Sequence, residues 1–308
     1  MPQAITFPFL ASVNDGVSLA YLRGLLGGAP SVYSEFCFDA SSTGSEEIYP
    51  MLAGLRGLRE WVGDRVVNGL SLSTFRIANK SFEETISVAR PNLEDDKYGM
   101  LTPAAQELGQ DAKDLPDLLT AALMKNGHTA LTFDGQNFFD TAHPNYTSTG
   151  AGTTVPNYVT GSGPSWYLLD TSRPSIRGFI YQRRRPYVIV PKFSLTDPSV
   201  FFDNEYVWGV DGRSNAGYGL WHFAFRSDAA LNLANLESAR AQMASLRRPN
   251  GAPMGIGAAR TLKLVVPTAL YPLAKGYCEN QFDPGQPSNL TPNTFRGMAT
   301  ALENNWLN

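Results

Sequence analysis

The sequence has few cysteines and few charged residues, and each shortage excludes a class of protein. The 308 residues include two cysteines, Cys37 and Cys278, which cannot form a disulfide framework and fit a reducing compartment. Charged residues make up 17% of the chain, and a net charge of -3 argues against a free-standing nucleic-acid binder, which usually carries a strongly basic face. No run approaches the roughly 20 apolar residues of a membrane span, so we expect no membrane partner.

Motifs that carry chemistry are also missing. The sequence contains no GxSxG nucleophile elbow, no HExxH, no CxxC and no Walker phosphate loop. Asp134, Asp140 and His143 form the tightest cluster of possible metal ligands. A turn at Asp134 and a loop ending at Pro144 explain these residues without a metal, so we predict no catalytic residue, no metal site and no cofactor. A metal-dependent hydrolase that uses these three side chains is the enzymatic alternative.

The chain contains enough apolar residues to form the hydrophobic core of one large domain or of two domains. Hydrophobic residues make up 43% of it, and a chain of this length buries roughly three-quarters of its unfolded surface. Strand-like and helical segments are interspersed without strict alternation, which predicts an α+β fold. The strand-like segments are 166–170, 176–185, 187–193, 201–210 and 261–267, and the helical ones are 233–247 and 268–282.

Residues 1–60 have the character of an N-terminal arm. Within them, 17–26 predicts a short helix that Gly27 would stop, and 33–39 alternates as a strand does. Residues 40–47 are polar and small, which indicates a flexible link. Because few long periodic elements occur here, we expect the arm to become ordered by lying on other surfaces.

Residues 61–101 predict an extended hairpin. Apolar and polar side chains alternate between Phe75 and Val88, and Asn79–Lys80 offers a turn in the middle. An isolated two-stranded ribbon is at best marginally stable in water, so a projecting hairpin would need a neighbouring subunit to cover its apolar face. An ordinary hairpin packed on its own domain is the alternative.

A long helix follows at residues 102–127. Thr102 is placed to cap it, Pro103 to occupy its first position and Gly127 to end it. At 1.5 Å per residue it would be roughly 39 Å long. Pro116 should bend this helix or divide it in two, with Asp114 capping the second part. One apolar stripe is formed by Ala105, Leu108, Ala112, Leu115, Leu119 and Ala122.

Seven motifs then occur in a fixed order. They are WVGDRVV, NKSFEETISV, LEDDKYG, FDGQNFFDTAHP, WYLLDTSRP, YVWGVDGRSNAGYGLW and LKLVVP. Together they resemble the Mu-like phage major head subunit family, the gpT family, from about residue 45 to the C-terminus. The first 45 residues contain no such motif.

This resemblance implies a major capsid protein with the Hong Kong 97-like fold. In that fold, strands similar to those at 166–210 follow the axial helices, so we expect a permuted strand order here. The implied parts are an N-terminal arm at 1–60, an extended-loop hairpin at 61–101, a peripheral domain at 102–215 built on a spine helix at 102–127, and an axial domain with a closing strand at 216–308.

The resemblance also implies partners and a location. Copies of the chain would form hexamers and pentamers of an icosahedral shell around double-stranded DNA, which the shell would contact without sequence recognition. A scaffold protein and a portal would take part in assembly, and a decoration protein is a further candidate partner. Assembly would occur in the host cytoplasm and the product would be the virion. An encapsulin-like compartment is the alternative with the same fold.

We expect the hairpin to supply contacts between subunits, and its charges to set register more than affinity. The basic run Arg183–Arg185 predicts a solvated strand edge, with phosphate contact as the alternative. The predicted contact residues are Phe75, Arg76, Ile77, Lys80, Phe82, Glu83, Glu84, Arg90, Glu94, Asp95, Asp96 and Lys97.

Overall fold

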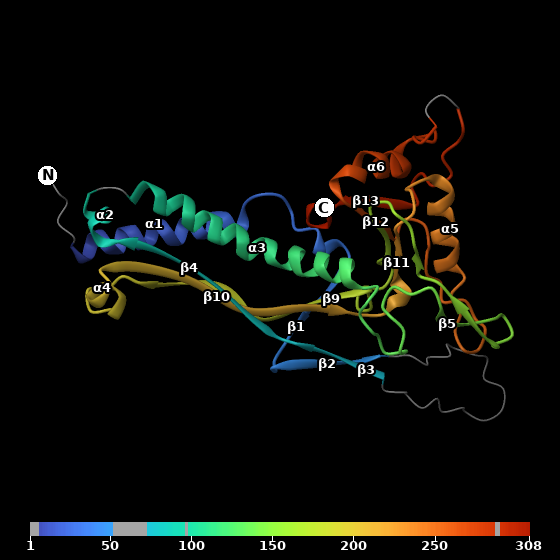
Figure 1. Ribbon diagram of the computed structural model, residues 1–308, viewed down its shortest axis with the longest axis horizontal. Helices are drawn as coiled ribbons and strands as arrows, with labels where there is room; N and C mark the ends of the chain where they lie inside the picture. Colours follow the sequence, from blue (N-terminus) through green and yellow to red (C-terminus); the bar gives the residue numbers. More distant parts are fainter. Residues whose placement is uncertain (1–5, 52–72, 96–97, 287–289) are drawn as a thin grey trace.

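Two β-sheets of different shape organise the molecule. The computed structural model describes residues 6–51, 73–95, 98–286 and 290–308, and in it a long sheet with two long helices extends away from a second lobe that holds the C-terminus (Figure 1). The four-stranded sheet has the order β1 (Cys37–Ser41), β9 (Phe179–Lys192), β10 (Glu205–Tyr218) and β4 (Lys80–Ala89). The five-stranded sheet has the order β13 (Ala299–Glu303), β12 (Leu262–Val266), β8 (Trp166–Asp170), β11 (Ala224–Ser227) and β7 (Tyr158–Val159).

Helices and two short strand pairs complete the described part of the chain. The strand pairs are β2 (Glu46–Met51) with β3 (Ser73–Ala78), and β5 (His143–Tyr146) with β6 (Gly152–Val155). The helices are α1 (Phe7–Leu26), α2 (Arg90–Glu94), α3 (Leu101–Asn126), α4 (Pro198–Phe202), α5 (Leu233–Ala244) and α6 (Tyr271–Glu279). Short 3₁₀ turns lie at Tyr33–Glu35, Tyr98–Met100, Trp221–Phe223, Thr268–Leu270 and Asn305–Leu307.

The long sheet is antiparallel through β9, β10 and β4. Side chains alternate along β10, so Trp208 and Val210 are buried in clusters with residues of α1 and α3. The segments 176–185 and 187–193, predicted as two strands, form the single strand β9. Its pairing with β10 shifts register opposite Pro186, where the missing backbone N–H makes an irregularity tolerable.

The predicted hairpin with a turn at Asn79 and Lys80 is wrong. Strand β3 pairs with β2, and β4 pairs with β10 over its whole length, from Lys80 to Ala89. The two strands therefore follow each other along the chain rather than pairing with each other, and β3 continues directly into β4 (Figure 1). The polar link predicted at 40–47 is wrong for half of its length, because the ends of β1 and β2 leave only residues 42–45 between them.

Helix α1 is longer than predicted and packs along α3. It starts at Phe7 rather than residue 17, with a proline in its first turn. Gly24 of α1 and Gly109 of α3 let the two backbones touch: a Cβ at Gly24 would collide with the carbonyl oxygen of Gln106, and one at Gly109 with that of Tyr21. The arm is thus ordered on the chain's own long helix.

Helix α3 is continuous through Pro116, so the two-helix alternative is wrong. It begins at Leu101, which places Thr102 inside the first turn instead of at the cap. Its buried stripe includes the predicted Ala105 and Leu108, but the C-terminal half turns other residues inward. Asp117 is one of them: it is 4% exposed and accepts hydrogen bonds from the amides of Val32 (3.2 Å) and Tyr33 (2.6 Å).

The last turn of α3 is hydrogen-bonded to both sheets, to Tyr218 of β10 and to Tyr167 of β8 and Arg226 of β11. A helix leaves its final four carbonyls without partners inside the helix, and here each accepts a hydrogen bond. The pairs are Leu123 O with Tyr218 Oη at 2.9 Å, Met124 O with Tyr167 Oη at 3.2 Å, Lys125 O with Arg226 Nη1 at 2.9 Å, and Asn126 O with the Thr129 amide at 3.0 Å.

Arg226 makes this attachment rigid because a carboxylate holds its guanidinium. Its Nε and Nη2 donate to the two oxygens of Asp228 at 3.0 Å each, and both side chains are about nine-tenths buried. Burial alone would raise the pKa of Asp228, but the bonds from Arg226, Ser165 and Tyr158 hold that pKa below its usual value. Removing either partner would leave a buried charge without compensation.

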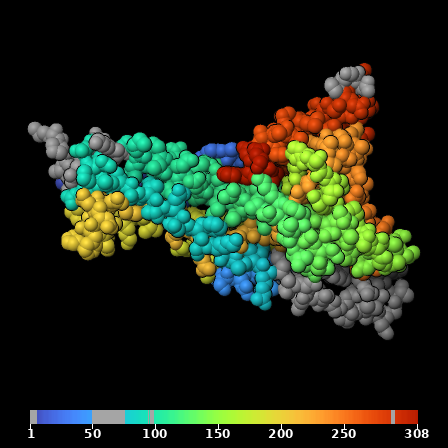
Figure 2. All heavy atoms as spheres, in the orientation of Figure 1, coloured from blue at the N-terminus to red at the C-terminus, as the bar shows by residue number. Residues whose placement is uncertain are grey.

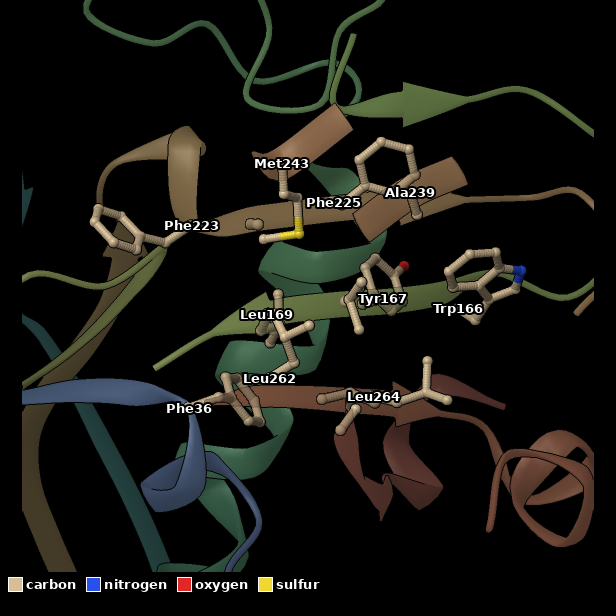
Figure 3. Close-up of a cluster of buried hydrophobic side chains, with 14 of the residues drawn as sticks. Phe36, Trp166, Tyr167, Leu169, Phe223, Phe225, Ala239, Met243, Leu262 and Leu264 are labelled. Atoms are coloured by element: carbon tan, nitrogen blue, oxygen red, sulfur yellow. The ribbon is translucent and has the colours of Figure 1, made fainter. Parts of the chain in front are cut away.

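The second lobe has its own core around the five-stranded sheet. All five residues of β8 are buried because α5 and the last turn of α3 pack near the sheet, and Trp166, Tyr167 and Leu262 are at most 1% exposed (Figure 3). Strands β7 and β8 pair with β11 and β12. The predicted boundary at 215/216, which put β7 and β8 in the other domain, is therefore wrong for these strands, as is the expectation that 145–165 is all loop.

Replacing Gly109 with Ala should destabilise the folded chain by about 1–3 kcal/mol, because the added methyl group forces α1 away from α3. Urea unfolding followed by circular dichroism measures this change. Gly16→Ala is the matched control: Gly16 is also in α1, has nothing near its Cβ position and should gain about 0.5–1 kcal/mol. Equal effects of the two substitutions would contradict the close contact.

Candidate assembly surface

The chain has more surface than a compact protein of its mass. Its accessible surface is 16268 Å², whereas a folded monomer of 33.6 kDa is expected to have roughly 12,700 Å². We call the long four-stranded sheet with α1 and α3 the elongated half of the molecule. Figure 2 shows that this half narrows toward α4. A chain with this much extra surface is suited to burying part of it against other copies.

Most of the predicted contact residues that can be described lie on the surface of β3, β4 and α2. Arg76 is 65% exposed and forms an ion pair with Glu46 at 3.3 Å, a surface pair worth at most about 1 kcal/mol. Lys80, Glu83, Glu84 and Asp95 are exposed, and Phe82 and Arg90 are half-buried. The backbone of Arg90 donates to Asn204 O at 2.9 Å, which joins α2 to the turn after α4.

Ile77 is the exception, and its prediction as an intersubunit contact is wrong. It is 3% exposed and packs with Ala40 and Ile180 of the same chain. The period-two pattern identified a buried face correctly, but β1 and β9 cover that face from within the subunit. Phe75 and Glu94 lie in β3 and α2 with undescribed side chains, and Asp96 and Lys97 lie outside the described residues.

Four carboxylates gather where β4 passes α3. Glu83 and Glu84 come from β4, and Glu107 and Asp111 from α3. Partial burial raises the pKa of Glu84, and the neighbouring Asp111 carboxyl raises it further. None of the four forms an ion pair with any residue that the structure describes. The sequence did not single out the two α3 members, because their proximity to β4 is tertiary.

A groove is lined by three of these carboxylate residues, Glu83, Glu84 and Asp111. Its volume is about 180 Å³. Leu108 and Val210 form its buried floor at 3% and 4% exposure. The remaining lining residues are Phe82, Ala112, Leu115 and Tyr187. The groove is therefore apolar inside and acidic at its rim.

The narrow end of the molecule carries exposed apolar side chains that are not among the predicted contact residues. Phe201 and Phe202 of α4 are 73% and 78% exposed and contact each other edge to face. Phe7 and Met100, at the starts of α1 and α3, are 72% and 81% exposed. Adjacent phenylalanines were an available signal, since a strand cannot bury both on one face. We call these four residues the apolar tip.

The arginine run is largely neutralised within the chain. Arg183 is ion-paired with Asp39 and Arg185 with Asp211. Arg184 donates from Nη1 to Ser42 O at 3.3 Å. Two of the three guanidiniums thus have carboxylate partners, which favours a structural edge over a phosphate site.

Of the three candidate metal ligands, the structure brings two together. His143 Nδ1 lies 2.8 Å from Asp134 Oδ2, with the imidazole fully buried. Asp140 turns away and accepts from the Ala142 amide at 3.0 Å. In the described part of the chain no three His, Cys, Asp or Glu side chains are grouped as a metal would require.

His143 begins a stack of rings. It lies on Trp221 with ring centroids 3.9 Å apart, and Trp221 lies on His222 at 3.8 Å. Phe133 continues the stack beyond His222 at 6.4 Å. Burial lowers the pKa of His222 to about 3, and His143 and Arg173 act in the same direction while Asp134 opposes them. The stack holds the loop after α3 against the turn at Trp221–Phe223.

Acidification should therefore destabilise the folded subunit through His222. The folded state keeps this ring neutral down to about pH 3, whereas the unfolded chain protonates it near the ordinary pKa of about 6.5. Between these values the unfolded state binds more protons, so the free energy of unfolding falls as the pH drops. Urea unfolding at pH 7.5 and pH 4.5 should show a smaller loss for His222→Phe, which keeps the stacked ring, than for the unaltered chain. Equal losses would contradict this assignment.

No helix among the described residues combines the length and apolarity that crossing a bilayer requires. A model of the family described as Mu-like prophage major head subunit gpT matches residues 10–307. The chain is similar to the major capsid protein of Escherichia phage Mu, with 36% identity over 254 residues, which cover 80% of this chain and 82% of that protein.

Solved phage capsids resemble the chain over nearly its whole length. A subunit of the procapsid of bacteriophage JBD30 gives a TM-score of 0.79 at 35% identity and covers 98% of this chain and 100% of that one. A subunit of the JBD30 capsid decorated with minor capsid protein trimers gives 0.73 at 29% identity, with 99% and 100% covered.

Proposed function

The chain belongs to the Mu-like prophage major head subunit gpT family, and we propose on this basis that its copies form hexamers and pentamers through the elongated half of the subunit. Its fold is the α+β Hong Kong 97-like capsid fold, and it is a shell-forming major capsid protein of the virion. The family match supports this function over an encapsulin-like compartment and over a metal-dependent hydrolase.

The excess of accessible surface carries the proposal about contacts. Roughly 3,500 Å² beyond a compact monomer is enough for several interfaces of about 800 Å² per partner. Many such contacts in a closed shell add up even when each is weak. We assign the main contact roles to the apolar tip, to the β4 surface and to the predicted hairpin residues that the structure leaves exposed.

The parts of the subunit take the roles expected of the fold. The N-terminal arm is α1 with the segment that follows it, and the spine is α3. The long sheet belongs to the peripheral domain and the five-stranded sheet to the axial domain. The pair β2 and β3 forms the base of the extended loop. The protein acts by assembly, without catalysis, cofactor or metal.

Further partners follow from the role of a shell. The inner face contacts packaged double-stranded DNA without reading its sequence. A scaffold protein and a portal take part in assembly in the host cytoplasm. The decorated JBD30 capsid supports a minor capsid protein as a partner of the outer surface.

Replacing both tip phenylalanines, Phe201→Ser with Phe202→Ser, should prevent particle formation while leaving the subunit folded. The two rings are exposed in the subunit, so their loss removes contacts between copies rather than core packing. Negative-stain microscopy counts particles, and thermal melting checks the fold. The control pair Phe201→Tyr with Phe202→Tyr keeps both rings and should assemble. Normal particles from the serine variant would contradict this role of the tip.

A further inference from the structure

We propose that the loop after α5, with four arginines around it, binds the phosphate backbone of the packaged duplex DNA. We call residues 247–257 together with the side chains of Arg173, Arg240, Arg247 and Arg248 the arginine loop. The inference deepens the proposed function and rests on it, because a phosphate partner of this kind requires a shell that encloses DNA. It assigns the DNA contact to one surface and to named side chains.

The stretch that contains this loop carries positive charge only. Between residues 238 and 278 there is no aspartate or glutamate, and the hairpin of β5 and β6 that packs on the loop adds none. The basic residues of the stretch are Arg240, Arg247, Arg248, Arg260, Lys263 and Lys275. In a chain whose net charge is -3, a stretch of one sign indicates a surface for an anionic partner.

The loop holds three guanidiniums by hydrogen bonds to its own carbonyls. The bonds are Arg247 Nη1 to Gly251 O at 2.8 Å, Arg173 Nη2 to Met254 O at 2.8 Å and Arg240 Nε to Gly257 O at 3.1 Å. Successive carbonyls of this set are three residues apart, so they lie within roughly 10 Å of each other. Duplex DNA carries one negative charge per about 1.7 Å of its axis, so charges this close together can contact neighbouring phosphates.

The arginines keep donors free for a ligand. A guanidinium has five N–H donors, and the bonds to the loop use one from each anchored side chain. Arg173 also lies over the Phe223 ring, 5.4 Å from its centroid, which fixes the plane of its guanidinium. None of the four arginines forms an ion pair with a residue that the structure describes. Planar donors held in place are suited to binding phosphate oxygens in pairs.

Asp170 bonds to the same loop without pairing with its arginines. It is 1% exposed, and its two oxygens accept from the amides of Ser172 at 2.7 Å and Gly257 at 2.6 Å. Because both bonds go to the backbone, this carboxylate fixes the shape of the loop and leaves the guanidiniums for another partner.

Glycines let a ligand come close to the loop backbone. Gly251, Gly255 and Gly257 have φ values of 80°, 72° and 79°, which glycine adopts most readily. A Cβ at Gly251 would collide with Ser148 O, so the loop is fixed on the turn between β5 and β6. Gly255 is exposed and has nothing within 4 Å of its Cβ position, which leaves room for a sugar–phosphate chain. α5 and β5 lie at the opposite end of the molecule from α4, so this surface is separate from the apolar tip (Figure 1).

Binding of the purified subunit to a labelled duplex of about 40 base pairs, followed by fluorescence anisotropy over a series of salt concentrations, tests the assignment. Arg247→Gln with Arg248→Gln should weaken binding by roughly tenfold or more at low salt. It should also lower the slope of log affinity against log salt by about 2, because two phosphate contacts are lost. Arg247→Lys with Arg248→Lys keeps both charges and should keep most of the slope.

Arg183→Gln with Arg185→Gln is the matched control. It removes the same charge, but from guanidiniums that Asp39 and Asp211 already hold, so the slope should not change. Equal losses for the control and the loop pair, or no loss for the loop pair, overturn the proposal. Failure of the unaltered subunit to bind the duplex overturns it as well.

Arg248→Gln alone covers the case in which the double variant does not fold. The Arg248 side chain makes no hydrogen bond within the described ranges, so its loss should leave circular dichroism unchanged and lower the slope by about 1. An unchanged slope from this folded variant overturns the role of Arg248 and with it the proposal.

Photo-cross-linking in DNA-filled particles locates the contact in the shell. Asn250→Cys places a thiol at the exposed turn of the loop for a photoreactive label, while the native Cys37 and Cys278 are buried. Thr196→Cys, an exposed position just before α4, is the control and should link to DNA far less.

Subunits linked to DNA through Asn250→Cys, and few through Thr196→Cys, support the proposal. The absence of a link at the loop, or equal linking at both positions, overturns it in particles shown to contain DNA, and the proposed function then still stands. If particles assembled with all their partners never contain DNA, the proposed function fails, and packaged DNA fails with it as the partner of the loop.

Discussion

The elongated half of the molecule depends on the bonds that hold the last turn of α3. Its four terminal carbonyls would be unsatisfied in an isolated helix, and here Tyr218, Tyr167, Arg226 and the Thr129 amide each donate to one of them. Arg226 is itself fixed by Asp228 in a buried pair, so the helix end and the five-stranded sheet form one rigid joint. From that joint α3 extends along the long sheet and carries α1 through the contact at Gly24 and Gly109.

This construction explains why the subunit can expose so much surface and still be ordered. The core of the C-terminal lobe supplies a fixed base, and smaller clusters along α1, α3, β9 and β10 keep the long half straight. The apolar tip and the acidic groove then lie on elements whose positions the base determines. A shell built from such subunits can rely on many modest contacts, since each contact surface is already in place before copies meet.

Periodicity in the sequence predicts the positions of helices and strands well, but it does not predict which strands pair with each other. The long helix, β8 and the helix after residue 232 were predicted within a few residues because each has a strong pattern or cap. The partner of β4 is β10, more than 100 residues away, and no local pattern encodes that pairing. The same limit applies to Ile77. Its alternating pattern predicts a buried side chain, but no local pattern shows that β1 and β9 of the same chain bury it.

The C-terminal half of α3 shows a second limit. Helical spacing predicted an apolar stripe, whereas Asp117 is buried because it binds the amides of Val32 and Tyr33. Such burial of a charged residue is specified by a remote segment of backbone. The carboxylate cluster is harder still to predict, because Glu107 and Asp111 come near Glu84 only once β4 lies beside α3. Family motifs identified the fold and function that periodicity alone left open.

The most direct test of the account is amide hydrogen exchange measured on the free subunit and on assembled particles. Contacts through the elongated half predict slower exchange on assembly in β4, in α4 and in residues 52–72, with the buried strands β8 and β12 unchanged because they are already protected. Slower exchange confined to the C-terminal lobe, with β4 and α4 unaffected, would contradict it.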